Sequence, residues 1–286
     1  MLTPSERITL ITEIARRLSV EDWPVLDLTL RQFGQLVDDS WRGERHPYVI
    51  SMIDRADDQS LVALANHLGY DVRKPSALVP SFWEPERFRL FITHLAAQKG
   101  DAGELQGALA RYGVSAFVAH RDIEPTKEWQ DEIELALSTC DALVALLHPD
   151  FHGSKWVDQE IGFAMGRGLL IVSIRFGEDP YGFIGRYQGL QGLGRAAGQL
   201  AVELVDIFAA NKLTSARMAE SLVSFFSSSD TFSEAKARLA LLDKISVWSP
   251  ALLERLRVSL QSNDQIYNAF GVPDRVRMII STRGAG

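Results

Sequence analysis

Residues 141–176 read DALVALLHPDFHGSKWVDQEIGFAMGRGLLIVSIRF, and this stretch decides the fold of the central part of the chain. The apolar run DALVALLH predicts a strand that is buried on both faces, and LLIVSIRF predicts a second one. Between them, SKWVDQEIGFAMGRG has the spacing of a helix. Strands that alternate with helices specify a parallel sheet covered by helices, so the stretch predicts an α/β architecture.

The same alternation extends upstream. RFRLFIT (87–93) and VSAFVAH (114–120) are short β-rich runs, and each precedes or follows a segment of helical spacing, GELQGALARYG (103–113) and KEWQDEIELALSTC (127–140). Downstream, AAGQLAVELVDIFAANK (196–212) predicts a long helix that packs back on the sheet. We therefore expect one α/β domain over residues 86–211.

Helical patterns flank this domain on both sides. Apolar residues recur at three- and four-residue steps from Ile8 to Leu18, and similar spacing returns in LDLTLRQFGQLV (26–37) and SLVALANHLG (60–69). Residues 1–74 are therefore predicted to form a small helical bundle. Residues 212–286 are predicted to be a second helical region, in which Ser249-Pro250 is a good helix start.

A linker is expected between the first helical module and the α/β domain. Pro75, Pro80 and Pro85 punctuate residues 75–85, and proline lacks a backbone donor and disfavours helix in the residue before it. The chain thus divides into four predicted parts, 1–74, 75–85, 86–211 and 212–286.

Composition excludes several classes of function. The net charge of −7 and the lack of a basic run argue against a nucleic-acid partner. No uninterrupted apolar stretch reaches the roughly 18–20 residues that span a bilayer, and charges occupy the start of the chain, so we expect a cytoplasmic protein with no membrane contact. The single cysteine, Cys140, lies beside an apolar run and is interpreted as a buried structural thiol.

A ligand site is expected in the loops at the carboxyl ends of the predicted strands, such as THLAAQKGD (93–101) and AHRDIEPTKEW (119–129). No metal site is predicted, because His148 and His152 are separated by Pro149 and have no third ligand at zinc spacing. Glycine-rich loops of the dinucleotide or nucleoside-triphosphate type do not occur either.

Four successive segments of the sequence together resemble a bacterial TIR (Toll/interleukin-1 receptor-like) domain. They are FITHLAAQKGD (91–101), the DIEP loop (122–125), EWQDEIELALSTCDALVALLHPDF (128–151) and KWVDQEIGFAMGRGLLIVSIRF (155–176). No single segment is specific, but their order and spacing are. The resemblance implies a flavodoxin-like parallel sheet of five strands. It also implies an enzyme that cleaves NAD between nicotinamide and ribose, with NAD as substrate and no resident cofactor.

Glu160 is the catalytic candidate. TIR domains of the enzymatic kind place a glutamate on the helix after the third strand, and Glu160 corresponds to it, with Trp156 four residues earlier. Residues at i and i+4 share a helix face, so the indole and the carboxylate can line one pocket. An ionised carboxylate stabilises positive charge on ribose as the ring departs, as in glycosidases. The competing interpretation is a solvated surface glutamate beside a core tryptophan.

Four further residues are candidates for NAD contacts. His94 ends the first predicted strand, where the family often has a nucleotide-contacting residue, and its alternative is a satisfied histidine. Asp122 belongs to a segment that resembles the family's BB loop. Trp129 and Phe151 fit either adenine stacking or the core.

The resemblance suggests an antiphage or toxin-like effector that depletes NAD once its TIR domains assemble in response to an unidentified phage or host trigger protein. One alternative is a TIR cyclase that converts NAD into a cyclic ADP-ribose signal. Another is a non-catalytic TIR adaptor that recruits partners. Self-association through the TIR and helical regions is expected in the first case.

Overall fold

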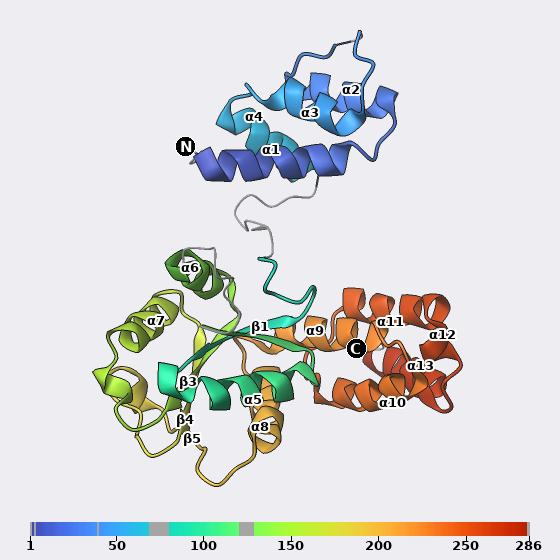
Figure 1. The fold of residues 1–286 in the computed structure, drawn as a ribbon. Coiled ribbons are helices and arrows are strands. Elements are labelled where there is room, and N and C mark those ends of the chain that lie inside the picture. Colours follow the sequence, from blue (N-terminus) through green and yellow to red (C-terminus); the bar gives the residue numbers. More distant parts are fainter. Residues whose placement is uncertain (1, 3, 39, 69–79, 120–128, 285–286) are drawn as a thin grey trace. The chain divides into compact units, whose positions relative to one another are not determined.

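A computed structural model describes residues 2, 4–38, 40–68, 80–119 and 129–284 (Figure 1). The chain divides into two compact units, residues 1–79 and residues 80–286. Each unit has hydrophobic clusters of its own. Over the described residues, no helix is long and apolar enough to cross a membrane.

The first unit consists of helices that bury apolar side chains against one another, among them Leu10, Ile14 and Leu64. Asp57 caps the last of these helices, because its side chain accepts a hydrogen bond from the Ser60 backbone N–H. The helices are α1 (Pro4–Leu18), α2 (Trp23–Gln32), α3 (Arg45–Ile53) and α4 (Asp58–His67).

Two details of this unit differ from the sequence prediction. The helix predicted over residues 26–37 ends at Gln32, because Gly34 adopts a left-handed φ of +76° just after the helix. Helix α3 was not predicted as a separate element, and it contains Pro47. Pro47 lies in the first turn, where the missing N–H would have no partner within the helix.

The second unit is built on a five-stranded parallel sheet with the strand order β2-β1-β3-β4-β5. The predicted α/β fold, with helical regions at both ends of the domain, is confirmed. The strands are β1 (Phe88–Thr93), β2 (Val114–Val118), β3 (Ala142–Leu147), β4 (Leu170–Arg175) and β5 (Leu190–Gln191).

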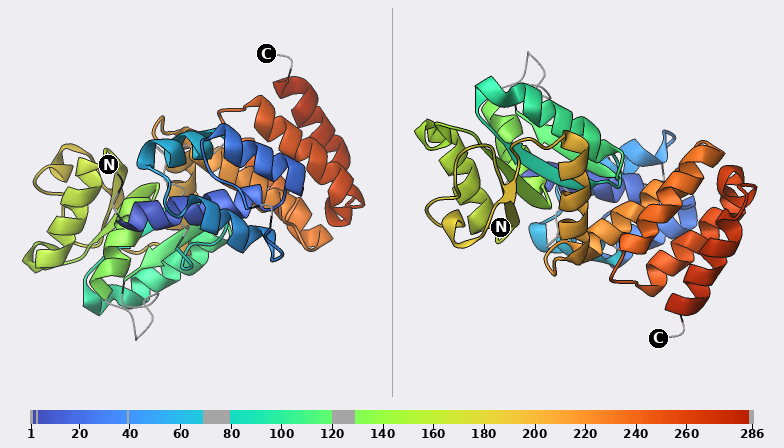
Figure 2. Two further views of the ribbon diagram at one scale, coloured as in Figure 1. Left: turned by 90° about the horizontal axis from the view of Figure 1, so that it is seen from above. Right: turned by 90° about the horizontal axis from the view of Figure 1, so that it is seen from below.

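Helices cover both faces of this sheet (Figures 1 and 2). Phe91 and Leu143 face α6 and α7, whereas Leu90, Ile92 and Val144 point to the opposite face, where α5 and α8 pack side by side. The helices are α5 (Lys99–Ala110), α6 (Trp129–Thr139), α7 (Lys155–Gly166) and α8 (Ala197–Ala210), with short 3₁₀ turns η1 (Ala96–Gln98), η2 (Phe151–Gly153) and η3 (Ile184–Arg186).

The C-terminal helices continue the core of the α5/α8 face. Phe208 of α8 stacks on Phe88 of β1, and Phe226, Leu256 and Val276 belong to the same cluster of buried side chains. The elements are α9 (Ser215–Ser227), α10 (Phe232–Leu239), η4 (Ala240–Lys244), α11 (Pro250–Ser262), α12 (Asp264–Tyr267) and α13 (Val272–Arg283).

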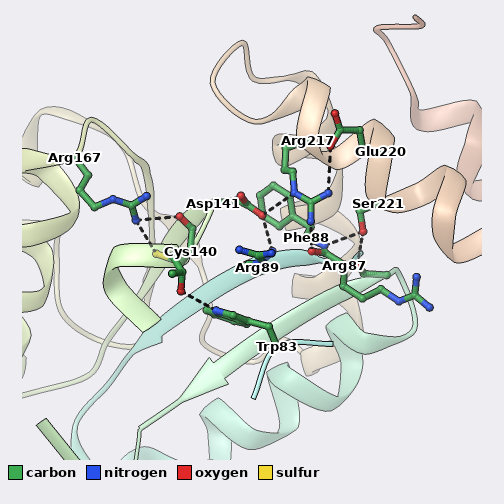
Figure 3. Close-up of polar contacts among 12 residues, drawn as sticks. Trp83, Arg87, Phe88, Arg89, Cys140, Asp141, Arg167, Arg217, Glu220 and Ser221 are labelled. Carbon is green, nitrogen blue, oxygen red and sulfur yellow. Dashed lines mark hydrogen bonds and ion pairs between the residues drawn. The ribbon is translucent and has the colours of Figure 1, made fainter. Parts of the chain in front are cut away.

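Polar contacts tie α9 to the amino-terminal end of the sheet (Figure 3). The Ser221 hydroxyl accepts a hydrogen bond from the Phe88 N–H (2.8 Å) and donates one to the Gly113 carbonyl (2.6 Å). Arg217 lies 3.3 Å from Asp141 and donates to the Arg87 carbonyl. The same helix therefore satisfies backbone groups where β1 and β2 begin.

Candidate functional site

The strand order predicts where a ligand would bind. From β1 the chain crosses to β2 on one side, and the later strands β3, β4 and β5 follow on the other side, so the winding direction reverses between β1 and β3. In doubly wound sheets, ligands bind outside the carboxyl ends of the strands at this switch point. Thr93 is the last residue of β1, and it pairs with Ala145 of β3.

Glu160 lies at this end of the sheet because of the way α7 begins. The Ser154 side chain caps α7 by accepting a hydrogen bond from the Trp156 N–H (3.4 Å). The helix then buries Val157, Glu160 and Ile161, whose spacing defines one helical face. A carboxylate thus occupies a position in an otherwise apolar stripe, and it is only 7% exposed.

Thr93 holds this carboxylate. Its hydroxyl donates a hydrogen bond to Oε2 of Glu160, with the two oxygens 2.5 Å apart. Both side chains are buried, so a residue of the central strand and a residue of α7 meet directly at the switch point. Thr93 was not among the residues predicted from sequence, although a polar residue that ends an apolar strand was a signal for it.

Burial sets the charge state of Glu160. Desolvation disfavours the ionised carboxylate and raises its pKa to about 7, while the hydrogen bond from Thr93 acts in the opposite direction. A glutamate whose pKa lies near neutrality exchanges its proton under physiological conditions. Perturbed carboxylates of this kind concentrate at functional sites.

His94 follows Thr93 and is buried at the same end of β1. Its Nδ1 lies 3.1 Å from the Ile92 carbonyl oxygen, which can only accept, so Nδ1 carries the proton. Trp156 lies one turn before Glu160 on α7, but its side chain is 42% exposed. The structure therefore places a buried acid and a surface indole on successive turns of one helix.

The other three candidates have different outcomes. Phe151 is fully buried in the core beneath α6 and α7, which favours the core interpretation over a stacking role. Trp129 is the first residue of α6, and its side chain lies outside the described part of the structure. Asp122 also lies outside the described residues.

Asp141 is a second largely buried carboxyl group, but its surroundings are different. Burial raises its pKa, and the neighbouring Arg217 and Arg89 oppose that effect. Asp141 accepts a hydrogen bond from the Arg89 backbone N–H (2.8 Å) and lies just before β3, at the amino end of the strands (Figure 3). Its role is to join α9 to the sheet, away from the switch point.

The structure also places three residues that the sequence did not assign to a site, Cys140, His148 and His152. Cys140 is buried, and burial raises the pKa of its thiol to about 12, so the thiol stays neutral. His148 stacks on Phe176, whereas Nε2 of His152 lies 3.0 Å from Glu178. Within the described residues, no three metal-binding side chains are grouped.

A comparison with protein families agrees with this geometry. Residues 90–198 match the family model described as "TIR domain", and this range runs from β1 to the first turn of α8. The chain contains a TIR domain. TIR domains include NADases and non-enzymatic adaptors, and they self-associate.

One solved structure similar to this chain is the TIR domain of the Toll-related receptor TRR-2 from the lower metazoan Hydra magnipapillata. The match has 19% sequence identity and a TM-score of 0.32, and it covers 36% of this chain and 82% of that chain. No curated protein matches the chain.

Proposed function

We propose that the TIR domain is an NAD⁺ glycohydrolase in which Glu160 is the catalytic carboxylate. The observation that supports the proposal is a buried glutamate, held by Thr93, at the carboxyl ends of β1 and β3. A glutamate that only solubilised α7 would point into water. Burial of an acid costs free energy, so a buried carboxylate at the switch point of the sheet favours a functional role over a structural one.

The chemistry needs little more than one negative charge. The bond between ribose C1′ and the pyridinium nitrogen breaks, and its electron pair moves to the nitrogen, so nicotinamide leaves as a neutral molecule without a general acid. Positive charge develops on the ribose, and the ionised Glu160 carboxylate stabilises it. Water then adds to C1′ and releases a proton, which gives ADP-ribose.

The raised pKa of Glu160 fits a site that is completed by its substrate. In the free protein, a carboxylate with a pKa of about 7 is ionised in only part of the molecules at neutral pH. The pyridinium of NAD is positively charged, and a nearby positive charge favours the ionised carboxylate. Binding of NAD thus lowers the pKa of Glu160 and produces the reactive form.

Other candidates take supporting parts in this proposal. Trp156, one turn before Glu160, offers an indole face to the cationic ring, and the aromatic quadrupole attracts such a cation. His94, at the end of β1, is assigned a contact with ribose or phosphate. Trp129 remains a candidate for stacking on adenine, and Asp122 remains a candidate for a contact with NAD.

We further propose that the protein acts in the cytoplasm as an assembly-activated antiphage effector. Continuous NAD destruction would kill the host cell, so activity has to wait until TIR domains self-associate in response to a trigger. Residues 1–74 are the proposed module for sensing or self-association. Expression in bacteria with and without phage challenge, followed by measurement of cellular NAD, tests this part.

The enzymatic proposal is tested with purified full-length protein at high concentration. We expect NAD to be converted into nicotinamide and ADP-ribose, resolved by chromatography, and Glu160→Gln to reduce the rate by at least about 100-fold. Glu104→Gln on the exposed face of α5 is the matched control and should retain activity.

The identity of the product and the activity of Glu160→Gln distinguish the glycohydrolase from the cyclase and from the adaptor. Cyclic ADP-ribose in place of the linear product would identify a cyclase with the same carboxylate, since exclusion of water decides what captures the ribose. NAD that stays intact at every protein concentration, with no difference between the wild type and Glu160→Gln, would support the adaptor and refute the enzyme.

A further inference from the structure

The outer edge of β4 is paired along only part of its length. Strand β5 contains two residues and pairs with Ile174 and Arg175. The Arg175 carbonyl accepts from Gly192, on the β5 side, whereas the Phe176 N–H donates to Leu147 of β3. Because backbone groups alternate sides along a strand, Ile171 directs its N–H and C=O away from β3. No described residue pairs with β4 on that side before Ile174.

A groove runs along this open edge. It has a volume of about 550 Å³, and residues 168–173 form one wall. The other walls contain Phe183, Tyr187 and Leu213, each more than half exposed. Large apolar side chains that gather in one exposed groove indicate an interaction surface, whereas single ones do not.

Charge in the groove is of one sign. Arg186 and Lys212 line it, and none of its lining residues is acidic, although the chain as a whole has a net charge of −7. Within the described structure, neither cation forms an ion pair with a carboxylate. The groove thus offers two positive charges to a negatively charged occupant.

The β2 edge, on the opposite side of the sheet, makes contacts that the β4 edge lacks. Phe82 and Trp83 pack on Phe117 of β2, and the Glu84 N–H donates to the Ser115 hydroxyl (3.0 Å). On the outer side of β2, the Gln106 side chain of α5 donates a hydrogen bond to the Ala116 carbonyl (2.8 Å), so a side chain satisfies a backbone group of that edge. Proteins usually protect exposed strand edges against pairing, so an edge left open beside an apolar groove is a feature that calls for a partner.

We propose that this groove binds an extended, acidic peptide segment of a partner protein, which adds to the sheet alongside β4. The peptide backbone pairs with the free N–H and C=O of Ile171. Alternate side chains enter the apolar groove, and carboxylates meet Arg186 and Lys212. Strand addition of this kind takes affinity from main-chain hydrogen bonds and specificity from alternate side chains. Glu160 does not line the groove, so the proposal stands independently of NAD cleavage.

The experiment presents the full-length protein to a displayed library of random peptides of about ten residues, a length that spans the edge at about 3.3 Å per residue. We expect selected peptides to alternate apolar residues with Asp or Glu. The double variant Arg186→Glu/Lys212→Glu should weaken their binding by about ten-fold or more. The control Lys236→Glu, on the exposed face of α10, should bind as the wild type does.

Amide hydrogen exchange locates the bound peptide. We expect a selected peptide to slow exchange at Ile171, and the same peptide with N-methylated backbone amides on the pairing side to bind poorly. Circular dichroism of the double variant checks that its fold is intact.

Several outcomes would overturn the proposal. They are a selection without binders, binders with apolar residues at helical spacing, and binders whose affinity survives the charge reversal. A change in the oligomeric state of the protein alone in Arg186→Glu/Lys212→Glu would assign the groove to a second copy of the chain instead. Because the readout is peptide binding, a protein that lacks NAD cleavage can still pass this test.

Discussion

At the scale of single residues, the TIR domain combines a buried acid with a hydroxyl that holds it. The catalytic candidate Glu160 could be named from sequence, because its segment resembles the family pattern. Thr93 could not be assigned a role in this way. Its contact with Glu160 joins residues 67 positions apart, and it depends on the register of β1 and on the start of α7. Only the folded structure provides both.

The pKa of Glu160 makes a prediction about stability. A carboxyl group whose pKa is raised in the folded state binds more protons there than in the unfolded state, so stability falls as the pH rises from about 4.5 to about 7. The loss amounts to about 3 kcal/mol above that range. Glu160→Gln cannot ionise and should lack this loss. Urea unfolding of both proteins between pH 4 and pH 8 measures it, and a pH-independent difference between them would contradict the pKa.

Thr93 makes a separate prediction about ionisation. Its hydrogen bond lowers the pKa of Glu160, so Thr93→Val should shift the titration of that carboxyl upward by about one pH unit, the equivalent of one hydrogen bond. The pH profile of NAD cleavage should move with it, with most of the activity recovered at high pH. Thr93→Ser retains the hydroxyl and should titrate like the wild type. A uniform loss of activity at all pH values would indicate a merely structural role for Thr93.

At the scale of elements, the apolar runs predicted β1, β2, β3 and β4 because buried parallel strands are continuously hydrophobic. Strand β5 could not be located, since two residues between glycines have no periodicity. The hydrogen bonds between α9 and the sheet could not be predicted from the sequence either, because a serine in an amphipathic helix is usually a polar surface residue. In the structure, Ser221 is fully buried.

Ser221→Ala tests these hydrogen bonds. The variant removes the hydroxyl that the Phe88 N–H and the Gly113 carbonyl share, and these two groups keep their direct hydrogen bond of 3.2 Å. Each hydrogen bond that is lost contributes about 0.5–1.5 kcal/mol net. We expect a decrease of about 1–2 kcal/mol in the free energy of unfolding, measured with urea. Ser233→Ala, at an exposed position of α10, should change it by less than about 0.5 kcal/mol. Equal effects of the two substitutions would refute the assigned role of Ser221.

At the scale of the whole molecule, the sheet and the C-terminal helices bury one continuous set of side chains. The sequence predicts separate regions at 86–211 and 212–286, because helical periodicity shows which face of a helix is buried but not what covers it. In the structure, residues 80–286 form one compact unit, and residues 1–79 form another.

A shared core predicts shared unfolding. Amide exchange in β3, α9 and α11 should report the same opening free energy, and Ser221→Ala should lower it equally in all three. Amides of α1 should keep their own value, because that helix belongs to the other unit. Mass spectrometry of exchanged peptides provides the measurement. Earlier opening of α11 in the wild type would show that the C-terminal helices unfold by themselves.

The difference between the open β4 edge and the β2 edge has a consequence for aggregation. Amyloid-type growth requires that every molecule offer two unprotected strands, one to receive a neighbour and one to be received. The Gln106 side chain occupies the Ala116 carbonyl on the outer side of β2, which interrupts pairing there and disfavours an endless ribbon of copies. Two copies could at most join β4 to β4 around a two-fold axis, which ends growth at the dimer.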